Sequence, residues 1–203
     1  MKSGLKHFPG HLDRTAQDDL VATLRDMVKA APLFQPVMPR TGRPFSVRMT
    51  NMGTLGWVAD RTGYRYQPIH PDTGAPWPAI PAQVLAIWRT VSGYSHDPEA
   101  CLVNFYQDGA KMGLHQDKDE EDFNAPVVSI SLGDAAIFRI GGTERGGKTE
   151  TIELSSGDVL VMGGDARLCF HGIDRVLQGT STLLNEGGRI NLTLRRVTRL
   201  LTR

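Results

Sequence analysis

Several features are scarce or missing in this sequence of 203 residues, and each absence excludes a class of protein. With only two cysteines, a framework of disulfides cannot support the fold. No apolar run approaches the length needed to cross a bilayer, and the opening MKSGLKHFPGH lacks the apolar core of a secretory signal. Internal repeats and low-complexity tracts are also missing. We therefore expect a protein of the reducing cytoplasm with no membrane partner.

A strong net charge is missing as well. Lys and Arg number 23 against 22 acidic residues, which gives a net charge of +1. Local clusters, rather than overall attraction, would have to hold a polyanion such as nucleic acid. The candidate phosphate contacts are Arg40, Arg43, Arg48, Arg61, Arg65, Lys111, Lys118, Arg139, Arg145 and Lys148.

The second half of the chain is rich in short strand-like segments. Each contains β-branched or aromatic residues and is bounded by Gly, Asp or Ser. The segments are CLVNFYQ, PVVSISL, AIFRI, TIEL, DVLVM, LCFH and GRINLTLRRV. This spacing predicts a mostly β (α+β) fold with a jelly-roll (double-stranded β-helix) core over residues 96–203. The length suits one well-buried domain, expected to span residues 1–203.

Two helices are expected in an N-terminal extension, residues 1–95. The first spans residues 13–31, because apolar side chains recur there on one face and Asp13 can serve as the N-cap. The second spans residues 81–92, with Pro at its start and Gly just after its end. Residues 36–78 lie between them and are rich in Gly, Pro, aromatics and Arg. We expect this segment to cover the core as a lid.

The triplet His-x-Asp occurs three times, although chance supplies only about 0.4 copies in a chain of this composition. After His11, the aspartate is better placed as a helix cap. His70 lies in a proline-rich loop, where Asp naturally caps its own backbone. His115 and Asp117 differ, because predicted strands stand on both sides of them. This last triplet is the candidate metal site.

A third metal ligand is needed, and the candidate is His171, which lies 54 residues beyond Asp117. Taken alone, His171 is better interpreted as a hydrogen-bonded core histidine. A jelly roll, however, can bring distant strands to the same mouth. Two imidazoles and one carboxylate can hold Fe(II) and leave positions open, as in non-heme oxygenases. A zinc hydrolase is the alternative use of the same ligands.

The last predicted strand alternates between apolar and polar side chains, because side chains on a strand have a period of two. Its apolar face holds Ile190, Leu192 and Leu194, and its polar face holds Arg189, Asn191, Thr193 and Arg195. A solvent-facing stripe on an edge strand is the alternative explanation. Another strand offers Leu102, Asn104 and Tyr106 on one face, so both could line one cavity. Paired arginines suit a dicarboxylate such as 2-oxoglutarate.

The sequence resembles the AlkB family of oxidative nucleic-acid demethylases from about Ser46 to Arg196. The resemblance lies in TNMGTLGW, YRY, CLVNFY, LHQDKDE, APVVSISLG, FHGI and RINLTLR, in that order. It implies a dioxygenase that uses Fe(II), 2-oxoglutarate and O2 to reverse base alkylation directly. The implied substrates are bases such as N1-methyladenine and N3-methylcytosine, and the implied products are the restored base, formaldehyde, succinate and CO2.

The resemblance also implies a role for each residue of the site. The implied iron ligands are His115, Asp117 and His171. The implied 2-oxoglutarate contacts are Asn104, Tyr106, Arg189, Asn191 and Arg195. The implied nucleotide contacts are Trp57, Tyr64, Tyr66, Asp119 and Arg145. Within the co-substrate site, we expect Arg195 to pair with the distant carboxylate and Arg189, with Asn191, to support the end bound to the metal.

Some residues have a second interpretation. Trp57, Tyr64 and Tyr66 would be ordinary core aromatics on composition alone. Asp119 lies in an acidic run that is typical of a solvated loop, but a carboxylate beside the metal would favour a positively charged methylated base. Met162 stands where the best-known family members have a Trp, which changes the packing around the co-substrate.

The expected partner is alkylated DNA, with RNA left open. Single strands are favoured, because no long aromatic wedge for opening a duplex is evident, and a monomer is expected. An oxygenase that acts on a protein side chain or a small molecule would share the core and differ in the segment 36–78. A catalytically silent binding module would leave the metal and anion residues unexplained.

Overall fold

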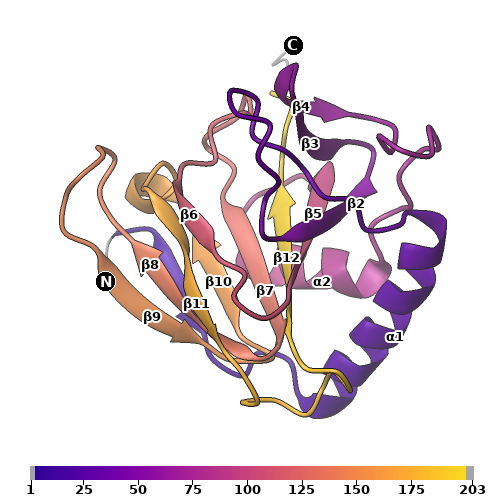
Figure 1. The fold of residues 1–203 in the computed structure, drawn as a ribbon. Helices are drawn as coiled ribbons and strands as arrows, with labels where there is room; N and C mark the ends of the chain where they lie inside the picture. Colours follow the sequence, from indigo (N-terminus) through magenta and orange to yellow (C-terminus); the bar gives the residue numbers. More distant parts are fainter. Residues whose placement is uncertain (1–2, 200–203) are drawn as a thin grey trace.

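The structure, a computed structural model, describes residues 3–199 and is built around two antiparallel sheets (Figure 1). The strands of the large sheet are β1 (Leu5–Phe8), β2 (Arg48–Gly53), β5 (Ala100–Tyr106), β7 (Val127–Gly133), β10 (Val159–Met162) and β12 (Arg189–Arg195). Their order across the sheet is β1-β10-β7-β12-β5-β2. Two of them, β1 and β2, come from the expected N-terminal extension and pair with β10 and β5.

The small sheet has the order β6-β11-β8-β9. Its strands are β6 (Met112–His115), β8 (Ala135–Ile140), β9 (Glu150–Leu154) and β11 (His171–Leu177). A separate hairpin joins β3 (Gly56–Asp60) to β4 (Gly63–Gln67), and a short 3-10 helix, η1, spans Gly164–Ala166. The predicted jelly-roll core of a mostly β chain is confirmed.

The two helices lie on the outer side of the large sheet, away from the small one (Figure 1). They are α1 (Arg14–Ala30) and α2 (Ala82–Val91), within a residue or two of the predicted ranges. As predicted, the Asp13 carboxylate accepts a hydrogen bond from the Ala16 N–H at 2.9 Å and begins α1. No helix among residues 3–199 is long and apolar enough to span a bilayer.

Strand alternation separates two hydrophobic cores. Leu192 and Leu194 of β12 pack with Leu20 and Leu24 of α1, so this face of β12 is covered by helix. The opposite face of the large sheet contributes to a second core together with Phe138 of the small sheet. Because β12 buries its apolar residues under the helices, its polar residues face the space between the sheets. The alternative of a solvent-facing stripe on an edge strand is therefore wrong, since β12 lies between β7 and β5.

One predicted strand is mostly absent. In LCFH only His171 belongs to a strand, which continues to Leu177. The preceding residues form a turn, because Cys169 N–H donates to Ala166 O and Phe170 N–H donates to Gly142 O. Five short strands were not expected from the pattern: β1, β2, β3, β4 and β6. They carry Gly, Lys, Arg, Asn or Gln inside segments of four to six residues, too few for a clear period of two.

Candidate metal and anion site

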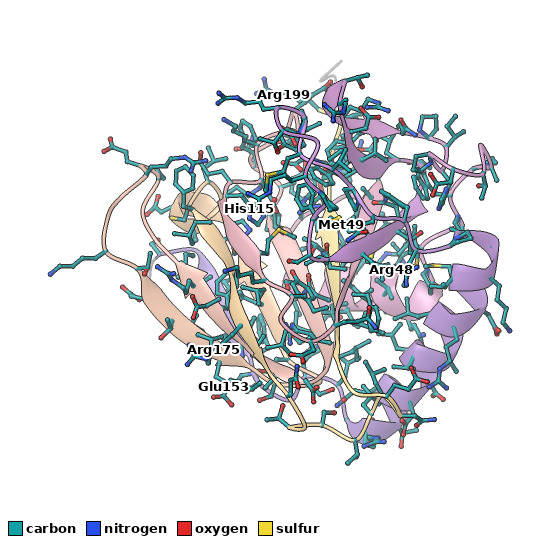
Figure 2. The ribbon with its side chains drawn as sticks, in the orientation of Figure 1. Arg48, Met49, His115, Glu153, Arg175 and Arg199 are labelled. Atoms are coloured by element: carbon teal, nitrogen blue, oxygen red, sulfur yellow. The ribbon has the colours of Figure 1, made fainter. Side chains whose placement is uncertain are left out.

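A cavity of about 510 Å³ opens between the two sheets. The polar face of β12 lines it, together with residues from β5, β6 and β11 and from the β3–β4 hairpin. His115 on β6 and Met49 on β2 lie on either side of this space, whereas Arg175 and Glu153 lie at the other end of the small sheet (Figure 2). A volume of this size is typical of a small-molecule site.

Three donor side chains meet at one end of the cavity, as predicted. His115 and His171 are direct cross-strand partners on β6 and β11, and Asp117 follows two residues after β6. The donor atoms of His115, Asp117 and His171 all lie within 4.8 Å of one another. The Asp117 carboxylate is 3.6 Å from His115 Nε2 and 3.9 Å from His171 Nε2. The jelly roll therefore unites ligands that are far apart in sequence.

Both imidazoles are held ready to bind a metal through Nε2. His115 Nδ1 lies 2.9 Å from Gly113 O, and His171 Nδ1 lies 3.0 Å from Cys169 O. A carbonyl oxygen only accepts, so each Nδ1 carries the hydrogen and each Nε2 keeps its lone pair. Burial, followed by the neighbouring His115, lowers the pKa of His171 to about 4, which keeps this ring neutral at physiological pH. Two imidazoles and one carboxylate fit Fe(II).

Arg195 lies directly against the Asp117 carboxylate. Its Nε and Nη2 are each 2.9 Å from Oδ2 of Asp117, and both side chains are buried. Burial opposes ionisation of Asp117, but Arg195, followed by the two histidines and Arg167, holds the pKa of Asp117 below its usual range. The carboxylate is thus a fixed anion, which is the form that binds a metal.

Arg189 lies six residues before Arg195 on β12, at the other end of the strand. The expected order of the two arginines along the cavity is therefore wrong, because Arg195 is the one that touches a metal donor. In sequence the two positions are equivalent members of one alternating face. Only the register of β12 against its neighbours decides which of them lies beside Asp117.

The guanidinium of Arg189 is fully buried without a carboxylate partner among residues 3–199. It donates to Asp134 O, Leu154 O and Ser131 Oγ, and its Nε has no partner in the described structure. Burial lowers the pKa of Arg189 to about 10, so the group is still a cation at neutral pH. A buried cation with a spare donor favours an anionic ligand.

Two polar side chains of β5 face Arg189 and Asn191 across the sheet. Tyr106 pairs with Arg189 in register, and Asn104 pairs with Asn191. Burial raises the pKa of Tyr106 to about 12, which leaves its hydroxyl protonated and able to donate. The buried Oδ1 of Asn104 has no partner among the described residues, while Asn191 is held by Ser129 Oγ at 2.7 Å.

Aromatic residues of the β3–β4 hairpin cover the mouth of the cavity. Trp57 and Tyr64 stack with ring centroids 5.6 Å apart, and Trp57 Nε1 donates to Asp119 at 2.9 Å. Arg145 lies on another wall, with its guanidinium over the Phe170 ring at 5.1 Å. All of these residues line the cavity.

Tyr66 is placed differently from the other predicted nucleotide contacts. It is absent from the cavity lining, and its hydroxyl donates to the buried carboxylate of Glu120, which itself lines the cavity. Its cross-strand partner Trp57 does face the cavity. The structure therefore does not bring Tyr66 to the mouth, because it holds this ring against the loop that follows Asp117.

Three residues near the site were missed from the sequence. Asn51 of β2, fully buried, fixes the Trp57 backbone by donating to Trp57 O and accepting from Trp57 N–H, both at 3.0 Å. Arg167 and Glu120 form a buried ion pair at 3.0 Å. Asn51 lies only six residues before Trp57, within TNMGTLGW, but a single Asn in that segment does not show which backbone it holds. Arg167 and Glu120 are 47 positions apart, so no local pattern marks their ion pair.

The other two His-x-Asp triplets, which begin at His11 and His70, are not metal sites. His70 is buried, with Nε2 2.7 Å from Pro32 O, and its Nδ1 accepts from Asp72 N–H. Both ring nitrogens are therefore used by the backbone. Asp13, beside His11, caps α1 instead. Among residues 3–199, the one group of donors close enough for a metal is His115, Asp117 and His171.

Facing sheets with a His-Asp-His site and a buried arginine define a class, the Fe(II)- and 2-oxo-acid-dependent oxygenases. Residues 4–195 match the family described as the 2OG-Fe(II) oxygenase superfamily, to which the chain therefore belongs. This superfamily uses Fe(II), 2-oxoglutarate and O2, and the chain is accordingly a dioxygenase of this kind.

Within the superfamily, the chain belongs to the AlkB family. It is 51% identical over 193 residues to an alpha-ketoglutarate-dependent dioxygenase AlkB homolog of Caulobacter vibrioides, with 95% of this chain and 87% of that protein covered. It is 45% identical over 184 residues to AlkB of Escherichia coli K12, with 89% and 84% covered. The solved structure of OsALKBH1 matches with a TM-score of 0.77 and 31% identity, covering 97% of this chain and 99% of that one.

Proposed function

We propose that this enzyme oxidatively removes methyl groups from bases such as N1-methyladenine and N3-methylcytosine in single-stranded DNA. The observation that carries the proposal is a buried arginine cation without a carboxylate partner, Arg189, in one cavity with three metal donors and under an aromatic mouth. Membership of the AlkB family supports a nucleic-acid base as the substrate.

The two arginines have separate tasks in this proposal. Arg189 pairs with the distant carboxylate of 2-oxoglutarate, assisted by the Tyr106 hydroxyl and by the amide nitrogen of Asn104, which lies opposite Asn191 and has a second hydrogen to donate. Arg195 fixes Asp117 and offers its free Nη1 to the 2-oxo-acid end. When bound, Fe(II) with 2-oxoglutarate and O2 supplies the oxidation of the methyl carbon. The protein positions the reactants and excludes water.

An alkylated base reaches this cavity only after it has left the base stack. In the proposal, Trp57 offers an aromatic face that replaces the lost stacking, and Tyr64 backs the indole ring. Arg145 and Asp119 stand on other walls of the same mouth. The Asp119 carboxylate uses one oxygen for Trp57, so its second oxygen and its charge remain for a cationic base.

The structure separates the candidate phosphate contacts into two groups. Arg65 and Arg139 are engaged in ion pairs with Asp60 and Asp174 at 2.7 and 3.3 Å. The exposed candidates without an ion pair among residues 3–199 are Arg40, Arg43, Arg48, Arg61, Lys111, Lys118, Arg145 and Lys148. Lys118 and Arg145 line the mouth itself. We propose that this second group holds the phosphates on either side of the extruded base.

The remaining proposals concern organisation. The chain would act as one domain over residues 1–203, with a nucleotide-recognition lid at about 36–78 within the extension 1–95 and the catalytic core at 96–203. The proposal also places the chain in the cytoplasm as a monomer, since two cysteines in 203 residues do not make a disulfide framework.

Released formaldehyde is the direct test of this function. The enzyme is supplied with Fe(II), ascorbate and 2-oxoglutarate, and with oligonucleotides that carry N1-methyladenine or N3-methylcytosine. We expect one formaldehyde for each methyl group removed, with single-stranded DNA faster than duplex DNA, and matched RNA strands as a further arm. Zero formaldehyde from every strand would contradict the proposal. Turnover of a small molecule or peptide instead would establish an oxygenase with another substrate.

Asp119→Asn tests the selection of positively charged bases. The Asn side-chain oxygen still accepts from Trp57 Nε1, so the orientation of the indole is kept while the charge is removed. We expect kcat/KM for N1-methyladenine to fall about tenfold, roughly 1.4 kcal/mol, and that for the neutral N3-methylthymine to change little. Equal losses on both bases, measured by formaldehyde release, would contradict an electrostatic role.

A further inference from the structure

Two hydrogen bonds connect the β3–β4 hairpin with the loop that carries a metal donor. Trp57 and Tyr66 are cross-strand partners in this hairpin. Trp57 Nε1 donates to Asp119 at 2.9 Å, and the Tyr66 hydroxyl donates to Glu120. These carboxylates follow Asp117 by two and three residues. The two side chains of this cross-strand pair lie on one face of the hairpin, and together they hold the metal-ligand loop at two successive residues.

Glu120 is the buried contact of the two, with a residue exposure of 5%. Arg167 Nη2 is 3.0 Å from one of its oxygens, and Arg195 Nε is 3.5 Å from the other. The same two arginines also reach Asp117: Arg167 Nη1 donates to its backbone oxygen at 2.6 Å, and Arg195 Nε donates to its carboxylate at 2.9 Å. Because both guanidiniums are shared, a shift of Glu120 disturbs Asp117.

Arg167 also links this loop to the other metal-ligand segment. It lies just after η1, four residues before His171, and its Nε donates to Ala125 O at 2.9 Å. The loop from Asp117 to Ala125 is thus fastened at both ends by one side chain that is 2% exposed. A buried network of this kind moves as a unit, because each broken bond leaves an unpaired polar atom.

We infer that Glu120 is a positioning residue that couples the β3–β4 hairpin to the metal site, so that loading the site with Fe(II) and 2-oxoglutarate stiffens the hairpin. Metal binding fixes Asp117. Arg195 and Arg167 then pass this constraint to Glu120, and Glu120 in turn holds Tyr66. By reciprocity, closure of the hairpin on a base favours the loaded site. The description of the hairpin as part of a nucleotide lid rests on the proposed function.

Tyr66→Phe tests the coupling, because it removes one hydroxyl and keeps the ring. Tyr94→Phe is the matched control: the Tyr94 hydroxyl donates at 2.5 Å to Asp122, a carboxylate of the same loop that accepts no hydrogen bond from the hairpin among the described residues. Amide hydrogen exchange of residues 56–67 is measured anaerobically with and without Fe(II) plus 2-oxoglutarate. We expect loading to slow exchange about tenfold in the wild type and in Tyr94→Phe, and less than about twofold in Tyr66→Phe.

Two results would overturn the coupling. One is an exchange rate of residues 56–67 in the wild type that does not change on loading, and the other is a slowing in Tyr66→Phe as large as that in the wild type. The visible absorption of the Fe(II)–2-oxoglutarate complex verifies that each variant is loaded. Glu120→Gln, which keeps an acceptor for Tyr66 but loses its charge toward both arginines, is expected to fall between the wild type and Tyr66→Phe. No nucleic acid enters this measurement, so failure of the formaldehyde test leaves the coupling intact, and the converse also holds.

Discussion

Asp117→Asn is expected to abolish demethylation and, in addition, to destabilise the metal-free protein. The carboxylate is a metal donor and the closest counter-ion of the buried Arg195, with two contacts of 2.9 Å. Asn keeps the shape but leaves the guanidinium with Glu120, at 3.5 Å, as its remaining charged partner. Breaking one side of a buried ion pair costs about 3–5 kcal/mol of folding stability. Because Arg195 keeps its contact with Glu120, we expect a loss near the lower value.

His115→Ala is the control that separates the two effects. Its side chain is 39% exposed, and apart from the metal site its ring donates a single hydrogen bond, to Gly113 O. We expect both variants to lose formaldehyde release by more than about a hundredfold, since each removes a metal donor. In thermal unfolding without metal, Asp117→Asn should melt about 6–12 °C below the wild type, and His115→Ala within a few degrees of it. Equal melting of Asp117→Asn and the wild type would contradict the structural role of the ion pair.

The direction of this effect with pH follows from the same ion pair. The pKa of Asp117 is lower in the folded protein than in the unfolded chain, mainly because Arg195 outweighs the opposing effect of burial. Its contribution to stability is therefore present above the unfolded pKa and is lost as pH falls through the folded pKa. The difference in melting temperature between wild type and Asp117→Asn should accordingly be fully developed at neutral pH.

The sequence predicts those parts of the site that depend on local patterns. The period of two in β12 is enough to place Arg189 and Arg195 in the cavity, because only the apolar face can meet the helices. The context of strands is enough to prefer His115 over His70, whose ring the backbone fully occupies. These features need no knowledge of how the strands pair.

What the sequence does not predict depends on register between distant strands. The pairing of β12 with β5 and β7 decides that Arg195 meets Asp117 and that Arg189 lies at the far end. The pairing of β3 with β4 places Trp57 and Tyr66 side by side on one face, where Trp57 lines the cavity and Tyr66 reaches Glu120. The contact of Arg167 with residues 117–125 spans more than forty positions. Such long-range contacts leave no local signature in a single sequence.

Arg189→Met is expected to remove the binding of 2-oxoglutarate with little change in the stability of the unloaded protein. Met fills a similar volume and replaces a buried cation that lacks a carboxylate partner among the described residues, so loss of its hydrogen bonds is offset by a smaller desolvation penalty. Loss of a buried charge pair with the ligand costs about 2–5 kcal/mol, which corresponds to a KM for 2-oxoglutarate raised by about 30-fold to several thousandfold. Arg175→Met, on an exposed arginine of β11 away from the cavity, is the control (Figure 2).

The identity of the carboxylate that Arg189 holds can be tested with a second ligand. 2-Oxopentanoate has the same carbon chain as 2-oxoglutarate and lacks only the distant carboxylate. If Arg189 pairs with that carboxylate, wild type and Arg189→Met should bind 2-oxopentanoate about equally in anaerobic titrations with Fe(II), while they differ strongly for 2-oxoglutarate. A loss of similar size on both ligands would place Arg189 at the metal-bound end instead. That result would conflict with the position of Arg195, because the 2.9 Å contact with Asp117 already assigns this end of the cavity to the second arginine.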